Sequence, residues 1–122
     1  MIKAYLHIAT MGVYQEIFDE MMGTIIKSNM LDKVELNICI VGDEILNVKE
    51  INNVKVHKVG GINEFEFATH QLIEDEIHKT EENIKILYFS GLGVTGNSEF
   101  KKSWRAYLTY FVVTQFEECL KA

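Results

Sequence analysis

Hydrophobic and polar positions recur along the chain with two different periods. Four segments have the two-residue alternation or short apolar run typical of strands: 2–9, 34–41, 54–59 and 84–89. Three segments have the spacing of three to four residues typical of amphipathic helices: 13–28, 66–80 and 103–120. The apolar positions that define these helices are Tyr14, Ile17, Phe18, Met21 and Ile25 in the first, Phe67, Leu72, Ile73 and Ile77 in the second, and Trp104, Leu108, Phe111, Val112 and Cys119 in the third.

The order β-α-β-β-α-β-α predicts a single α/β domain over residues 1–122, built as a three-layer Rossmann-like fold. Right-handed crossovers give a mostly parallel four-stranded sheet of order 3-2-1-4 with three helices. Ligands of such sheets bind beyond the carboxyl ends of the strands, where the strand order reverses. A site is therefore expected among the loops 10–12, 42–44 and 90–96.

Composition narrows the class of protein. The 122 residues are 48% hydrophobic and 25% charged, which is typical of a globular domain. With 12 basic and 18 acidic residues the net charge is -6, which argues against general binding to nucleic acid or anionic membrane. The apolar runs are too short for a membrane span, and the N-terminus does not resemble a signal peptide, so we expect a cytoplasmic protein.

The residue types that often hold metals or perform catalysis are scattered. Cys39 and Cys119 stand in apolar surroundings, and no C-x-x-C or H-x-x-x-H spacing occurs, so we expect two reduced, buried cysteines and no metal site. The four histidines are expected to be packing or surface residues, with a cysteine–histidine pair as the alternative. The acidic run 74–76 is expected to be a solvated helix face, with a metal role as the alternative.

The segment 91–96 matches the G-x-G-x-x-G pattern of dinucleotide-binding loops and follows a predicted strand. In that motif a helix opens at once and a further strand follows, whereas here seven residues separate Gly96 from Trp104 and no strand follows. We therefore expect a flexible loop at a ligand edge.

Other residues near the predicted edge suit a binding site. Asp43 and Glu44 follow the second strand, where a carboxylate either binds a base or ribose hydroxyl or forms a turn. Arg105 lies in the first turn of the last predicted helix, where a cation opposes the helix dipole, and an anionic ligand would account for that placement.

Four segments in order, 5–10, 63–69, 86–94 and 104–111, resemble a family of glycosyltransferase-like proteins of the GT-A type with bacterial, phage and large-virus members. The match is good in Trp104-Arg105-x-Tyr107 and in Tyr110-Phe111. The chain departs from the family pattern at Ala68 and His70, where the family has Pro and Leu, and at residues 90–92, Ser-Gly-Leu, where it has His-Thr-Lys.

This resemblance implies a glycosyltransferase-like protein that binds a nucleotide or nucleotide sugar and transfers the sugar to an unknown acceptor. It covers what would be the nucleotide-binding half, so we expect the acidic motif for Mn or Mg and the acceptor site to lie outside these residues, which contain no D-x-D triplet. The alternatives are a non-catalytic nucleotide-binding module and an interaction module without a pocket. The expected nucleotide contacts are Thr10, Asp43, Ser90 and Gly91, with Arg105 near the diphosphate.

Residues 84–89 form an edge strand in the predicted order and carry one charge and no proline. The last helix adds aromatic residues, namely Tyr107, Tyr110, Phe111 and Phe116. We expect a two-fold homodimer built on this edge or on the last helix. The alternative is a monomer whose last helix folds over the edge.

Overall fold

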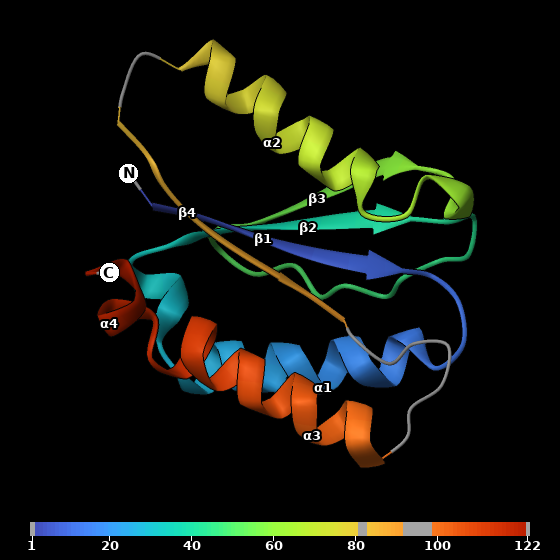
Figure 1. Cartoon of the computed structure of the whole chain (residues 1–122), viewed down its shortest axis with the longest axis horizontal. Helices are drawn as coiled ribbons and strands as arrows, with labels where there is room; N and C mark the ends of the chain where they lie inside the picture. Colours follow the sequence, from blue (N-terminus) through green and yellow to red (C-terminus); the bar gives the residue numbers. More distant parts are fainter. Residues whose placement is uncertain (1, 81–82, 92–98, 122) are drawn as a thin grey trace.

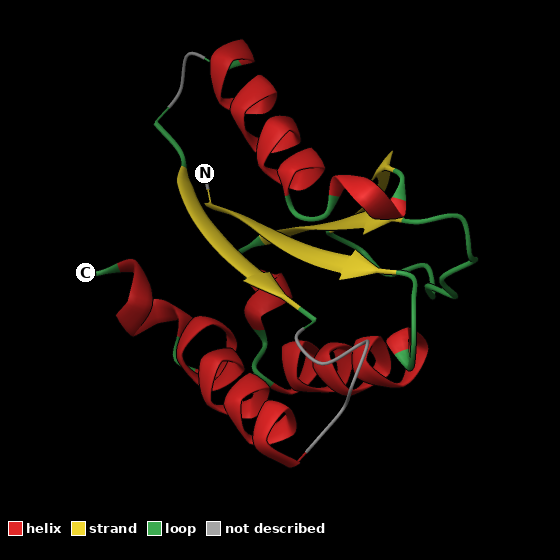
Figure 2. Cartoon of the chain, turned by 45° about the vertical axis from the view of Figure 1, so that its right-hand side comes forward, coloured by secondary structure: helices red, strands yellow, loops and turns green. Residues whose placement is uncertain are grey.

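The computed structural model describes residues 2–80, 83–91 and 99–121. Its elements are β1 (Ile2–Ala9), α1 (Tyr14–Lys27), β2 (Glu35–Val41), β3 (Val54–Gly60), α2 (Phe67–Lys79), β4 (Lys85–Ser90), α3 (Glu99–Thr109), a π-helical turn (Tyr110–Thr114) and α4 (Phe116–Leu120). The four strands form a parallel sheet of order β3-β2-β1-β4, as predicted. Helix α2 covers one face of this sheet, and α1 and α3 cover the other (Figures 1 and 2). The prediction of a Rossmann-like α/β fold is confirmed.

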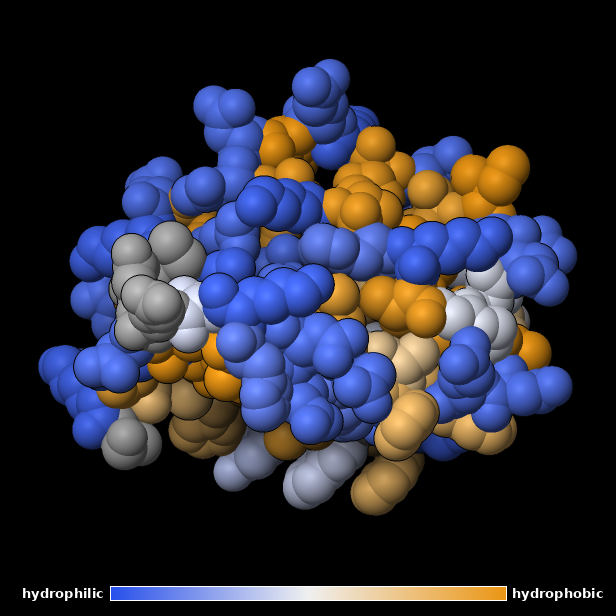
Figure 3. Space-filling model, turned by 90° about the horizontal axis from the view of Figure 1, so that it is seen from above, coloured by the Kyte–Doolittle hydropathy of each residue, from blue (hydrophilic) through white to orange (hydrophobic). Residues whose placement is uncertain are grey.

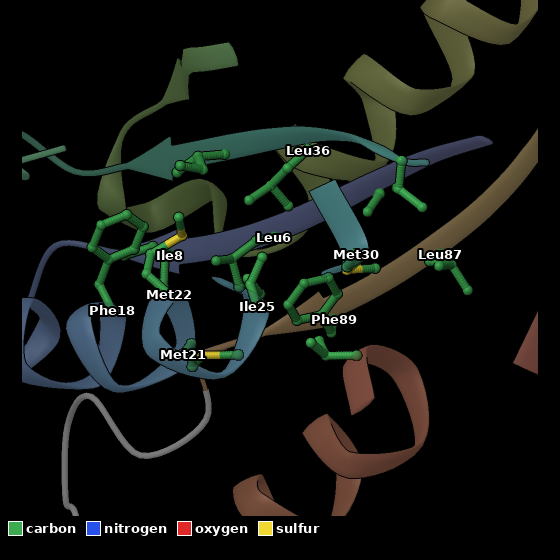
Figure 4. Packing of buried hydrophobic residues seen from close by; sticks show 14 of the residues in the cluster. Leu6, Ile8, Phe18, Met21, Met22, Ile25, Met30, Leu36, Leu87 and Phe89 are labelled. Carbon is green, nitrogen blue, oxygen red and sulfur yellow. The ribbon is translucent and has the colours of Figure 1, made fainter. Parts of the chain in front are cut away.

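The face of the sheet over α1 and α3 is apolar, because alternate residues of each strand point to it. The side chains that pack between this face and α1 form the main hydrophobic core, shown in Figure 4. Leu6 and Ile8 of β1 lie at its centre, with Met21 and Ile25 of α1 against them, and each is at most 1% exposed. The helical spacing predicted for α1 is confirmed by these residues.

The face of the sheet over α2 is polar. Aligned positions form rows across the strands: Lys55, Asn37, Tyr5 and Tyr88 in one, and His57, Cys39, His7 and Ser90 in the next. The helix that covers this face buries mainly the small and polar Ala68 and Thr69, together with Ile73. The outer surface over α2 is largely hydrophilic, with hydrophobic residues in gaps between polar ones (Figure 3).

Two inward positions predicted for α2 are wrong. Phe67 is 69% exposed and Ile77 is 42% exposed, while Ile73 is buried as expected. The cause is the polar face beneath the helix, because α2 turns its small and polar side towards the hydrogen-bonding groups of the sheet. Periodicity locates the apolar positions of a helix, but the partner surface decides which of them are buried.

The last helical segment also differs from expectation. It begins at Glu99 rather than near Ser103, and a π-helical turn divides it. The predicted stripe is largely solvent-facing, since Trp104, Leu108 and Phe111 are each more than 40% exposed. The buried side instead contains these residues: Arg105, Thr109, Val113 and Phe116. Cys119 is exposed, so the expectation of two buried cysteines is confirmed for Cys39 and wrong for Cys119.

Candidate functional site

The polar row nearest the carboxyl edge of the sheet contains His7. Its neighbours in register are Cys39 on β2 and Ser90 on β4, and Thr69 of the first turn of α2 lies above it. The His7 ring Nδ1 is 2.8 Å from the Thr69 hydroxyl oxygen. The strand order reverses between β1 and β4, so this row lies at the position where open α/β sheets bind ligands.

The second ring nitrogen of His7 is available to a ligand. His7 is only 6% exposed, yet no hydrogen bond of its Nε2 occurs among the described residues. Within those residues no fully buried side-chain nitrogen or oxygen lacks a partner, so Nε2 reaches solvent. Desolvation lowers the pKa of His7, with an opposing effect of Glu66 and a lowering effect of His70. The ring is therefore a neutral hydrogen-bonding group near pH 7.

Cys39 is packed rather than reactive. It is fully buried, and desolvation raises the pKa of its thiol to about 12. The thiolate is the nucleophilic form of cysteine, so this residue does not suit nucleophilic catalysis at neutral pH. Its sulfur lies 3.8 Å from the Asn37 carbonyl oxygen. The cysteine–histidine alternative therefore has no support at Cys39.

The segment that enters α2 forms one wall above this row. Phe65 has φ 49°, a left-handed conformation that is rare for a bulky residue, and its side chain is 69% exposed. Beside it, Tyr88 of β4 donates a hydrogen bond to Glu66, and the rings of Tyr88 and His70 lie 4.7 Å apart. A strained aromatic residue next to hydrogen-bonding groups is typical of functional segments.

Thr10 and Asp43 differ in what their side chains do. Thr10 is buried, and its hydroxyl donates to the Val41 carbonyl oxygen at 3.2 Å. Gly42, at φ 114°, lies so close that a Cβ there would be 2.1 Å from the Thr10 hydroxyl oxygen. This contact between the β1 and β2 ends leaves Thr10 in a structural role. Asp43 is exposed beyond β2 and remains accessible to a ligand or to water.

Ser90 and Gly91 end the fourth strand next to His7. The Gly91 N–H donates to the His7 carbonyl oxygen at 3.0 Å, which extends the pairing of β4 with β1 by one bond. A Cβ at Gly91 would lie 2.8 Å from Cδ1 of Ile8, so the glycine permits close approach of the two strands. The remainder of the predicted glycine-rich loop, residues 92–98, lies outside the described residues.

Arg105 is placed differently from the prediction. It is the seventh residue of α3 rather than a first-turn residue, and it is 1% exposed. Its Nε and Nη2 donate to the two carboxylate oxygens of Glu20 on α1, at 2.7 Å and 3.1 Å. The guanidinium thus joins two helices on the apolar side of the sheet, whereas the His7 row lies on the other side.

The amino-terminal half of the polar face is stabilised by ion pairs. The Glu35 carboxylate lies 2.8 Å from Lys55 and 3.5 Å from Lys3. Burial opposes ionisation of Glu35, but hydrogen bonds from Lys55 and Asn37 and the charge of Lys3 outweigh it and lower the pKa of this carboxyl. Tyr5 donates to Glu76 at 3.1 Å, which joins the sheet to α2. The ion pairs of Glu35 join β2 to its two neighbouring strands, and the hydrogen bond of Tyr5 ties α2 to the sheet.

Two hollows are relevant to binding. One, of about 410 Å³, lies between β3 and α2 and includes His57, Lys58, Glu64 and Gln71. It adjoins the His57 end of the row that contains His7. The other, of about 570 Å³, lies between α1 and residues 47–51. Both carry charged and amide groups, but the first suits a polar ligand better, because the walls of the second include Phe18, Met22 and Ile26.

Among the described residues no three His, Cys, Asp or Glu side chains are grouped so that they could hold a metal ion. Within the same residues, no helix combines the length and apolarity needed to cross a bilayer. Comparison with protein-family models, curated proteins and solved structures gave no match.

Sequence reasoning missed His7 and Thr69. His7 was expected to be a packing or surface residue like the other histidines, and Thr69 was not considered as a site residue. A signal was present in the polar positions of two strands, Lys3-x-Tyr5-x-His7 and Glu35-x-Asn37-x-Cys39, which share one face of the sheet once the strands are paired. A fully apolar face would be expected for a sheet covered by helices on both sides.

Proposed function

We propose that this chain is a nucleotide-binding α/β domain of the glycosyltransferase-like kind, which holds a nucleotide or nucleotide sugar at the carboxyl edge of the sheet on the α2 side. The observation that carries the proposal is that Nε2 of His7 has no hydrogen bond among the described residues, although His7 is only 6% exposed and lies in the row of the sheet next to the reversal of strand order. Open parallel sheets of this order bind their ligands at that point.

The chemistry of the proposed site favours hydroxyl groups. A neutral imidazole accepts or donates one hydrogen bond at Nε2, according to the tautomer that its Nδ1 contact with Thr69 selects. The carboxylate of Glu66 accepts hydrogen bonds and lies beside Tyr88. Such acceptors suit the hydroxyls of a ribose or a transferred sugar, as acidic residues do in dinucleotide-binding sheets. The proposed orientation places the ribose or sugar next to His7.

Two further features support a nucleotide. Exposed Phe65 offers an aromatic surface against which a base can stack. The first turn of α2 has no side-chain cap at its N-cap residue, and uncapped helix N-termini attract anions. In the proposal the diphosphate lies near this end of α2. It does not lie near Arg105, because the guanidinium of Arg105 binds Glu20.

The proposal covers binding and derives no transfer step. Sugar transfer remains what the resemblance implies, and the described residues supply no metal-binding cluster from which to build it. A non-catalytic nucleotide-binding module has the same geometry at this edge. Activity of a longer protein that contains this domain would distinguish the two.

The test is a thermal-shift screen of nucleoside diphosphates and nucleotide sugars, followed by calorimetry on the best ligand. A ligand at a hundred times its Kd stabilises the folded state by about 2.7 kcal/mol. The variant His7→Phe removes both ring nitrogens and keeps an aromatic ring, and it is expected to weaken binding about tenfold through the lost hydrogen bond. The control is His78→Phe, at an exposed position of α2.

Two results would reject this function. One is that no nucleotide or nucleotide sugar raises the melting temperature of the wild-type chain. The other is that a nucleotide binds and His7→Phe, shown to be folded by circular dichroism, binds it as tightly as His78→Phe does.

A further inference from the structure

Helix α3 and the π-helical turn after it carry an aromatic surface that nothing in the described chain covers. It consists of Phe100, Trp104, Tyr107, Leu108, Tyr110 and Phe111, which are between 43% and 77% exposed. Trp104 and Tyr107 stack with ring centroids 5.7 Å apart, and Phe111 packs edge-on against both Tyr107 and Tyr110. We call these six residues the aromatic patch. None of them carries a charge.

The orientation of α3 is the reverse of an ordinary surface helix. Its charged Arg105 and polar Thr109 are buried towards the body of the protein, and its aromatic side faces solvent. A surface helix normally buries its apolar stripe. The ion pair between Arg105 and Glu20 and the burial of Val113 and Phe116 in the main core hold this side inward, so the patch is a built feature of the helical segment.

The helix that carries the aromatic patch lies next to an open edge of the sheet. Strand β4 pairs with β1 on one side only, and no described strand pairs with its outer edge. Figures 1 and 2 both show β4 at the margin of the sheet, with α3 beneath the face that β4 shares with β1. The two edges of the sheet differ in protection: β3 carries Lys55, His57 and Lys58, whereas β4 carries only Lys85.

We propose that β4 and the aromatic patch form the interface of a two-fold homodimer, in which the β4 strands of two copies pair antiparallel. A two-fold axis perpendicular to the sheet keeps the patches of both copies on one side, where they meet. In a register centred on Leu87 or Tyr88, Lys85 of each copy lies opposite an uncharged residue of the other. Like charges therefore do not face one another across the strand pair.

The available area fits a second copy. Aromatic side chains present about 150–250 Å² each, so the exposed parts of the five aromatic residues amount to roughly 550 Å². A stable interface buries about 800 Å² on each partner, and the edge of β4 supplies the remainder. A patch of roughly 550 Å² lies near the upper end of the range of about 300–600 Å² for the largest apolar patch of a monomer, and such patches often mark an interface. Dimerisation through the aromatic patch does not require the proposed nucleotide, which would bind on the other face of the sheet.

The test is light scattering behind a sizing column on the full chain. The wild type is expected at twice the 14.1 kDa chain mass at micromolar concentration. Tyr107→Lys places a charge in each copy of the patch and is expected to weaken dimerisation at least about 100-fold. The matched control is Phe67→Lys, an equally drastic change at an exposed position of α2, which is expected to leave the dimer intact.

A second measurement locates the strand pairing. Amide hydrogen exchange of β4 is expected to slow as protein concentration rises, because the outward N–H groups become paired in the dimer. A wild-type mass of one chain up to about 100 μM would overturn the proposal. It would also be overturned by a dimer that both Tyr107→Lys and Trp104→Lys leave intact, or by one in which exchange of β4 is independent of concentration. Circular dichroism confirms that each variant is folded, and Trp104→Lys replaces Tyr107→Lys if the latter is not.

Discussion

The contact between Arg105 and Glu20 determines how α3 sits on the protein, and its strength can be measured. The two donors of the guanidinium lie 2.7 Å and 3.1 Å from the two carboxylate oxygens, which is the bidentate geometry that makes such pairs strong. The Arg105 side chain is 1% exposed and the Glu20 side chain is 43% exposed. Glu20→Ala therefore leaves a buried guanidinium without this carboxylate.

The expected loss follows from these exposures. Removing one partner of a fully buried pair destabilises a protein by about 3–5 kcal/mol. Water reaches the Glu20 carboxylate, which screens the interaction, so we expect Glu20→Ala to lower the free energy of unfolding by about 1–2 kcal/mol. Arg105→Ala also removes packing and is expected to cost about 2–4 kcal/mol. The coupling between the two sites is expected at about 1–2 kcal/mol.

The assay is a double-mutant cycle by urea denaturation, with far-ultraviolet circular dichroism as the probe. The control cycle uses Lys33 and Glu117, which are 3.0 Å apart and each 60% exposed. Exposed pairs of this kind couple by at most about 1 kcal/mol, and we expect less than about 0.5 kcal/mol here. The contrast between the two cycles separates burial from distance, because the nitrogen–oxygen distances are similar.

Additive effects of Glu20→Ala and Arg105→Ala would refute this reasoning. If Arg105→Ala left the free energy of unfolding unchanged and weakened nucleotide binding, the guanidinium would serve a ligand, as the sequence suggested, rather than α1. If Arg105→Ala lowered the free energy of unfolding and the folded variant bound the nucleotide as tightly as the wild type, Arg105 would have a structural role only.

Three further outcomes are expected. Gly42→Ala should lower the free energy of unfolding by at least about 2 kcal/mol in urea denaturation, because a Cβ at φ 114° would meet the Thr10 hydroxyl at 2.1 Å, and wild-type stability would contradict this. Exposed Cys119 should react with a thiol reagent at about pH 8, whereas buried Cys39, with its pKa raised to about 12, should react only when the chain unfolds. Mass spectrometry identifies the labelled cysteine, and equal labelling of both would contradict this expectation. Because the folded pKa of Glu35 lies below its ordinary value of 4.5, its contribution to stability is present above that value and is lost as the pH falls through the folded pKa. The melting temperature of Glu35→Gln should therefore fall less than that of the wild type between about pH 6 and about pH 3, and parallel curves would exclude this group.

The element order and the strand order could be read from the sequence. Hydrophobic period distinguishes strand from helix locally, and right-handed crossovers between neighbouring strands favour the order 3-2-1-4, which the sheet has. The location of a site at the carboxyl edge follows from that topology, and Ser90 and Gly91 do lie there beside His7. These features depend on local pattern and on chirality, which one sequence contains.

The tertiary structure decided which side of each helix is buried and which strand residues meet. Arg105 binds Glu20 of α1, a partner 85 positions away in the chain, because α3 starts earlier than expected and turns this side chain inward. His7 and Thr69 are 62 positions apart in the chain, and they come into contact only because α2 packs on this part of the sheet. Hydrophobic periodicity gives the angle between positions on one element, whereas the absolute rotation of that element is set by the surface against which it packs.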